Sequence, residues 1–282
     1  MGIVYGLAAA LFWGTGDFFI NRLTLLAGTI RSLILTQIFS LIIWIVVVCL
    51  TRTGVATPEL WGMAILSGCF HVIGLALTYR AFEIGTLSIV SPLASSFAVV
   101  TALLELVSGE RTPALALLGT GCVVLGIIVV TRFSSSDGPT SLRGVPEAIG
   151  SALAFGIMFW LISGVETKMG VAWPLMILKT MALLSALGAF LLSRKKTTDE
   201  PTTFKWRPEL GLAFSIGALD TLAWAAWIFG THFSFKTVVT ALASAFSAVT
   251  VIMAAFLLKE RLRVQQYGGI ALLLAGIVLV SV

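Results

Sequence analysis

Four ionisable side chains interrupt long apolar stretches of this sequence: Asp17, His71, Lys179 and Asp220. An ionisable group at membrane depth costs at least about 2.5 kcal/mol on insertion scales, so each is a candidate functional group unless it lies near a helix end. Together, a carboxylate, an imidazole and an ammonium group can hold a polar solute or exchange protons. These four residues are therefore the first candidates for substrate binding or ion coupling.

Each of the four also has a structural alternative. Asp17 lies within about one turn of the end of its apolar stretch, where a carboxylate reaches the interface by snorkelling. His71 could be a satisfied core histidine, and Lys179 could form an ion pair with Asp17 or Asp220 that only holds helices together. For each of these residues, the functional role and the structural role stay open at the level of sequence.

Aromatic and small polar residues on the same predicted helices extend the candidate site. Tryptophan rings can clamp an aromatic or cationic solute, whereas serines in membranes more often join helices. Gln37 lies one residue after the position that aligns with Lys179. The further candidates for substrate binding or coupling are Trp13, Gln37, Ser95, Trp224, Trp227 and Ser244.

No motif of a catalytic or metal centre accompanies these residues. The sequence has no H-E-x-x-H, no G-x-S-x-G and no phosphate-binding G-x-x-x-x-G-K-[ST]. We therefore expect no cofactor and no metal, and a membrane-embedded enzyme is the less favoured alternative. Uphill transport by this chain would have to draw on an ion or solute gradient.

The elements that position these residues are apolar and long. Of the 282 residues, 58% are hydrophobic and 11% charged, and the mean hydropathy is +1.04, which excludes a soluble globule. The loops carry the net charge of +5, which suits lipid headgroups rather than nucleic acid. Ten runs are long enough to cross a bilayer: 3–20, 32–50, 60–79, 86–107, 113–131, 147–165, 173–192, 210–230, 237–258 and 264–281. The sequence therefore predicts an all-α, multi-pass protein of the cell membrane.

The second half of the chain repeats the first. Residues 242–250 resemble 93–101, Glu260-Arg261 resembles Glu110-Arg111, and the glycines that follow match in spacing. Aligning Gly68 with Gly217 puts His71 and Asp220 at the same position. Each copy has five spans, an odd number, so the second copy must cross the membrane upside down. We predict two inverted five-helix repeats, 1–132 and 146–282, joined by a linker at 133–145.

The distribution of basic residues indicates on which side of the membrane the termini lie. Thirteen of the 18 Lys and Arg residues fall in loops after odd-numbered spans and four in loops after even-numbered spans. Because Lys and Arg accumulate on the cytoplasmic side, this distribution favours both termini outside.

Several short motifs resemble a known family: Trp13-Gly14, Tyr79-Arg80-Ala81-Phe82, Ser91-Pro92 and Gly109-Glu110-Arg111, followed by Gly119 and Gly126. The pattern resembles the ten-helix EamA-type members of the drug/metabolite transporter superfamily over nearly the whole chain. The resemblance implies a central cavity lined by the first four helices of each bundle, with the fifth helices outside, and both termini inside. The family usually has a proline early in the fourth and ninth helices. Here Ala241 matches Pro92, which predicts that the two helices do not kink alike.

The resemblance also implies a function. We expect a secondary transporter or exporter that moves small polar or amphipathic metabolites, such as amino acids, by alternating access to a site at the membrane midplane. A lipid or lipid-precursor flippase of the same fold is the alternative. The expected partners are a small-molecule substrate and the lipid bilayer; protons are candidate coupling ions, and a homodimer remains open.

Overall fold

The computed structural model describes the chain except residues 52–56, 86, 133–142, 195–205, 258–263 and 282. The described residues form twelve α-helices and no strand. They are α1 (Gly2–Ala27), α2 (Thr29–Thr51), α3 (Pro58–Ile84), α4 (Leu87–Ser95), α5 (Phe97–Val107), α6 (Ala114–Arg132), α7 (Val145–Met169), α8 (Ala172–Arg194), α9 (Trp206–Phe233), α10 (Lys236–Ser244), α11 (Phe246–Leu257) and α12 (Val264–Ser281). Most of the predicted linker at 133–145 lies outside the described residues.

The helices are built for a bilayer. Within the described part of the chain, six of them, α1, α2, α3, α7, α8 and α9, are long and apolar enough to cross a membrane. Their outward faces are apolar too, as Ile42, Val46 and Leu50 on α2 illustrate. A helix that is apolar on all sides is stable where lipid surrounds it, because its backbone groups are satisfied internally. The prediction of an all-helical, multi-pass membrane protein is confirmed.

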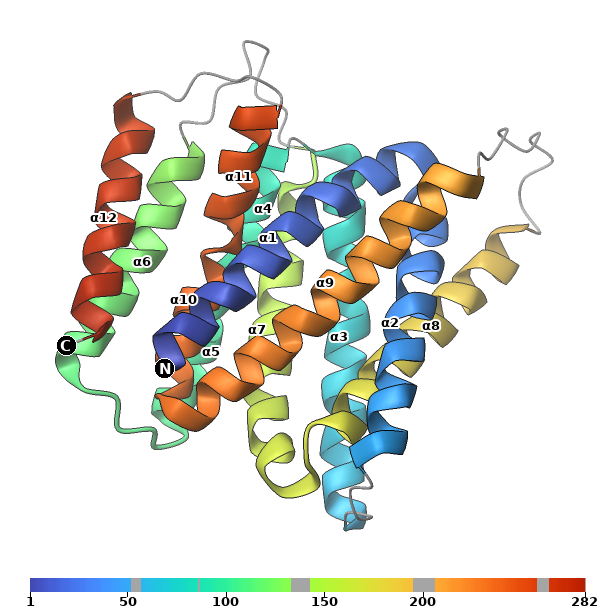
Figure 1. Ribbon diagram of the computed structural model, residues 1–282, viewed down its shortest axis with the longest axis horizontal. Helices are drawn as coiled ribbons and strands as arrows, with labels where there is room; N and C mark the ends of the chain where they lie inside the picture. Colours follow the sequence, from blue (N-terminus) through green and yellow to red (C-terminus); the bar gives the residue numbers. More distant parts are fainter. Residues whose placement is uncertain (52–56, 86, 133–142, 195–205, 258–263, 282) are drawn as a thin grey trace.

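Helices of the two halves pack in reciprocal pairs. Helix α1 packs along α9 as α7 packs along α3, and α2 contacts α9 as α8 contacts α3. Two further pairs, α2 with α8 and α6 with α12, each join helices that occupy the same position in the two halves of the sequence. Figure 1 shows α6 and α12 side by side at one edge of the molecule, away from α2, α3 and α8. This exchange of partners is what an internal two-fold axis produces.

Two of the predicted spans are broken at matching positions. Helix α4 ends before Ser96 and α10 before Ala245, and both residues have ψ close to 0°, at −2° and 0°. Their amides donate to the carbonyls of Leu93 and Leu242 at 3.2 and 3.1 Å, three residues back, which tightens the chain locally. The expectation that the two helices differ because Ala241 replaces a proline is wrong. The break does not require that proline.

Each broken helix docks on a glycine of the other half. The Thr101 hydroxyl donates to the Gly156 carbonyl and the Thr250 hydroxyl to the Gly14 carbonyl, both at 3.1 Å. A Cβ at Gly14 would lie 2.5 Å from the Phe246 carbonyl oxygen, so no larger residue fits this approach. Small residues let helix backbones approach closely in membranes. The two broken spans also contact each other, because the Ser95 hydroxyl donates to Ser247 at 3.0 Å.

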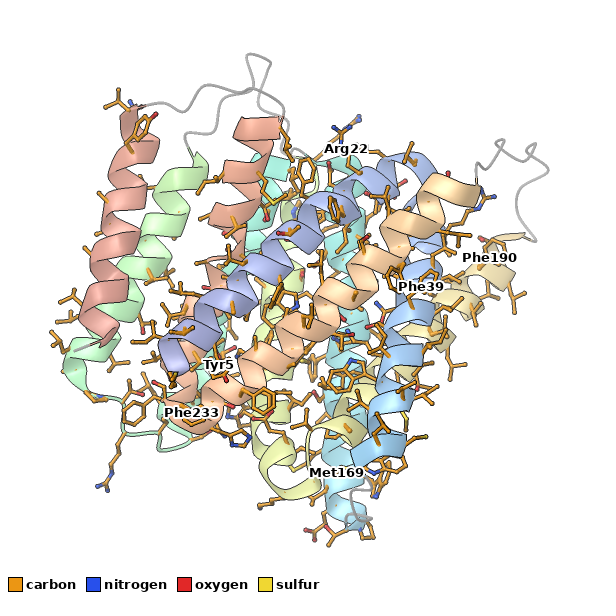
Figure 2. All side chains as sticks on the ribbon, viewed as in Figure 1. Tyr5, Arg22, Phe39, Met169, Phe190 and Phe233 are labelled. Atoms are coloured by element: carbon orange, nitrogen blue, oxygen red, sulfur yellow. The ribbon has the colours of Figure 1, made fainter. Side chains whose placement is uncertain are left out.

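The turns after the first helix of each half match as well. Gly28 follows α1 with φ 74°, and Gly170 follows α7 with φ 75°, a region that favours glycine. Figure 2 places Tyr5 and Phe233 at one end of the molecule and Arg22 near the opposite end. The Tyr5 and Phe233 rings stack at 5.9 Å, which fixes the start of α1 against the end of α9.

We predict that Gly14→Ala and Gly156→Ala lower the thermal stability of the detergent-solubilised protein. Overpacking a close contact costs about 1–3 kcal/mol, and the added methyl group would push the broken helix away. Gly188→Ala is the matched control, because a Cβ at that helical glycine meets nothing within 4 Å. Melting temperatures of the two docking variants equal to that of Gly188→Ala would contradict the docking role.

Candidate functional site

A cavity lies between the two halves and consists of two adjoining hollows. Their cavity volumes are about 90 and 40 Å³. Six residues line both: Trp13, Asp17, Ile20, Leu75, Tyr79 and Asp220. The lining comes from α1, α2, α3, α4, α5, α7, α9 and α11, whereas α6 and α12 contribute no residue that the structure describes there. The cavity is thus built from helices of both halves.

The strongest electrostatic contact in the cavity wall joins Lys179 and Asp220. The Lys179 Nζ lies 2.6 Å from Asp220 Oδ2, and the Ser40 hydroxyl donates to the same oxygen at 2.8 Å. The lysine side chain is 1% exposed and the aspartate side chain 24%. Sequence alone left Asp17 and Asp220 open as partners of Lys179. The structure pairs it with Asp220, and Ser40 links the pair across to α2 of the first half.

Asp17 is the second carboxylate at the cavity, and it has a much weaker partner. Its only hydrogen bond within the described structure comes from the Ser91 hydroxyl at 3.5 Å, the limit for such a bond. It forms no ion pair with any described residue. Asp17 therefore presents a carboxylate to both hollows without a cation beside it.

Two buried polar side chains lack partners at the cavity. Neither ring nitrogen of His71 has a hydrogen-bond partner among the described residues. The amide oxygen of Gln37 has none there either. The two side chains are 2% and 4% exposed, and each lines one of the hollows. Buried polar atoms are nearly always hydrogen-bonded in folded proteins. Unpaired atoms at a cavity wall are therefore available to a bound molecule or water.

Aromatic rings form one side of the larger hollow. Phe159 stacks on Trp224 at 5.1 Å between ring centroids, and the Trp13 ring meets Trp224 edge to face at 5.5 Å. Phe97 and Phe246, the residues directly after the two helix breaks, stack on each other at 6.2 Å. The same contacts that dock the broken helices therefore shape this aromatic wall.

Three of the predicted site residues neither line the cavity nor form an ion pair with a residue that lines it. Trp227 is fully buried and donates to the Thr240 hydroxyl at 3.1 Å. Ser95 donates to Ser247 at 3.0 Å, and Ser244 donates to a carbonyl of its own helix. Their contacts are those of residues that join or position helices. The other seven predicted residues line the cavity or, in the case of Lys179, pair with a lining residue.

Sequence reasoning missed several residues of the site. Ser40 was not proposed, although Ser32, Thr36 and Ser40 recur every four residues and so form one polar stripe on a helix. Phe155 was also missed. The pair Phe155-Gly156 repeats Trp13-Gly14 at 142 residues, and this spacing would have revealed it.

A separate polar network connects the two halves near the helix ends. The Ser163 hydroxyl donates to Glu105 at 2.7 Å, and the Lys236 ammonium donates to the Ser163 carbonyl at 2.9 Å. Nearby, Thr231 donates to Glu166 at 3.2 Å. Glu105 lies in the last turn of α5, which ends at Val107. The structure shows that Glu105 is 7% exposed and that its hydrogen bond connects α5 to α7.

Comparison with known proteins identifies a family, a relative and a solved structure that are similar to this chain. The model of the EamA-like transporter family matches residues 1–132 and 142–282. Uncharacterized protein MJ1333.1 of Methanocaldococcus jannaschii is 28% identical over 131 residues, which cover 46% of this chain and 95% of that protein. A solved structure titled only as a crystal structure of a protein superposes with a TM-score of 0.72 at 17% identity, over 99% of this chain and 95% of that one.

We predict that removing one charge of the Lys179–Asp220 pair destabilises the protein more than removing both. Breaking a buried pair typically costs about 3–5 kcal/mol because the remaining charge has no partner. Lys179→Met and Asp220→Asn should each lower the melting temperature of the solubilised protein. The double variant should recover most of the loss. Additive losses in the double variant would show that the two charges do not interact.

Proposed function

Because the chain belongs to the EamA-like transporter family, part of the drug/metabolite transporter superfamily, we propose that it is a secondary transporter. Its substrates would be small polar or amphipathic metabolites, amino acids or similar molecules, taken up from one side of the membrane and released on the other. The observation that supports this proposal best is the position of the cavity. Asp17 of the first half and Asp220 of the second line the same space.

Alternating access follows from the inverted-repeat interpretation. Counting α4 with α5 and α10 with α11 as one broken span each gives ten crossings, divided between 1–132 and 146–282. The half-length relative from M. jannaschii supports this division, because a protein of about one repeat covers 46% of this chain. Rocking of one five-helix bundle against the other would expose the cavity to each side in turn.

We assign roles to the cavity residues from their contacts. Asp17, Gln37 and His71 have free polar capacity and would contact the solute or carry protons. Trp13 and Trp224 would bound its apolar part. Lys179 and Asp220 would neutralise each other's charge. Trp227, Ser95 and Ser244 would position the surrounding helices.

The proposal predicts solute-specific exchange by the purified protein in proteoliposomes. Counterflow of a panel of amino acids, sugars and organic amines should exceed that of empty liposomes for at least one class. Asp17→Asn and Asp220→Asn should each reduce that flux by at least about tenfold, since tenfold corresponds to only about 1.4 kcal/mol of lost interaction. An imposed pH gradient, applied to the same vesicles, reports whether protons are coupled.

Two outcomes would contradict the proposal. One is flux no greater than in empty liposomes for every solute tested, and the other is wild-type flux in both variants. A fluorescent lipid included in the same vesicles tests for the flippase alternative, because its movement between leaflets would then be accelerated.

The network around Glu105 would have to open in each transport cycle, because it ties α5 of the first half to α7 of the second. We predict that bridging Glu105→Cys and Ser163→Cys with a short reducible bifunctional thiol reagent stops counterflow. The native cysteines would first be replaced by serine. Reductant should restore the flux, and each single-cysteine variant serves as a control. Full flux through the bridged protein would contradict the opening of this network.

A further inference from the structure

Acidic side chains outnumber basic ones in the described lining of the cavity. Two carboxylates line it, Asp17 and Asp220, and the described lining contains no lysine or arginine. Asp220 already has a partner, since Lys179 lies 2.6 Å and the Ser40 hydroxyl 2.8 Å from its Oδ2. Among the described residues, Asp17 has only the hydrogen bond of 3.5 Å from Ser91. One carboxylate is therefore left without a compensating charge.

Lys179 cannot easily serve a carboxylate of the substrate. Its side chain is 1% exposed, it contributes nothing to the lining of either hollow, and its Nζ is committed to Asp220. The same Nζ lies 5.8 Å from the centre of the Trp224 ring, a cation–π contact with a residue that lines the larger hollow. A substrate carboxylate in the cavity would face the Asp17 carboxyl group and no lysine or arginine of the described lining.

The rest of the wall favours a cation with an apolar body. Seven aromatic side chains line the larger hollow: Trp13, Tyr79, Phe97, Phe155, Phe159, Trp224 and Phe246. The face of an aromatic ring attracts a cation, by about 0.5–2 kcal/mol depending on solvation. It also stacks with another ring. The ammonium of Lys179 over Trp224 is an example of the first contact within this protein.

We propose that the cavity selects a monovalent organic cation that carries an aromatic ring, with Asp17 as the residue that determines this selectivity. The ammonium group of an arylalkylamine would pair with Asp17, and its ring would lie against the aromatic wall. The amino acid with the same ring adds a carboxylate, for which the described lining offers no lysine or arginine. This inference rests on the proposed transport function and narrows its substrate class.

The test compares molecules that differ in one group. Binding of 2-phenylethylamine, phenylalanine and the uncharged 2-phenylethanol to the purified wild-type protein is measured by competition against a radiolabelled arylalkylamine. We expect the amine to bind at least about tenfold more tightly than either of the other two. Asp17→Asn should remove the preference for the amine over the alcohol. Glu59→Gln, the same change at an exposed carboxylate in the first turn of α3, should leave the preference intact.

Three results would overturn this assignment. They are phenylalanine binding as tightly as the amine, no binding of any arylalkylamine, or an unchanged preference in a well-folded Asp17→Asn variant. The wild-type comparison needs no variant, so misfolding of Asp17→Asn would not obscure the answer. If the assignment fails but proteoliposomes still exchange another solute, the proposed transport function stands and only the substrate class is wrong.

Discussion

The contact on which the structure depends is the one between a broken helix of one half and a glycine of the other. It occurs twice, with Thr250 bound to Gly14 and Thr101 bound to Gly156. In lipid, two helix backbones approach this closely where small residues lie at the contact. Reciprocal docking brings the residues after the two breaks together at the internal axis. The aromatic wall of the cavity is a consequence of this packing.

The cavity's polar chemistry lies where the two copies differ. Phe159 occupies the position in α7 that matches Asp17 in α1, when Gly14 is aligned with Gly156. In the same way His71 matches Asp220, and Lys179 matches an uncharged residue. Packing within lipid constrains the shared positions, because both halves need the same close contacts. The unshared positions are free to carry charge, and the low dielectric around them makes each unpaired charge consequential.

Much of this arrangement could be predicted from sequence because it depends on type and spacing. Apolar length predicted the membrane helices, and charge at membrane depth singled out Asp17 and Asp220. Sequence could not choose the partner of Lys179, since chain spacing does not define how helices rotate against each other. Sequence also led to a wrong prediction at Ala245, because the absence of a proline predicted that this helix would not kink like its counterpart in the first half. That break coincides with a tertiary contact, the docking of Thr250 on Gly14.

The central claim is that solute binds in the cavity between the two halves. The most direct measurement is the rate at which a thiol reagent alkylates Leu75→Cys, a position that lines both hollows, after the native cysteines are replaced by serine. A solute that the variant exchanges in proteoliposomes should slow alkylation in proportion to its occupancy. A transported solute that leaves the alkylation rate unchanged at saturation would show that the site lies elsewhere.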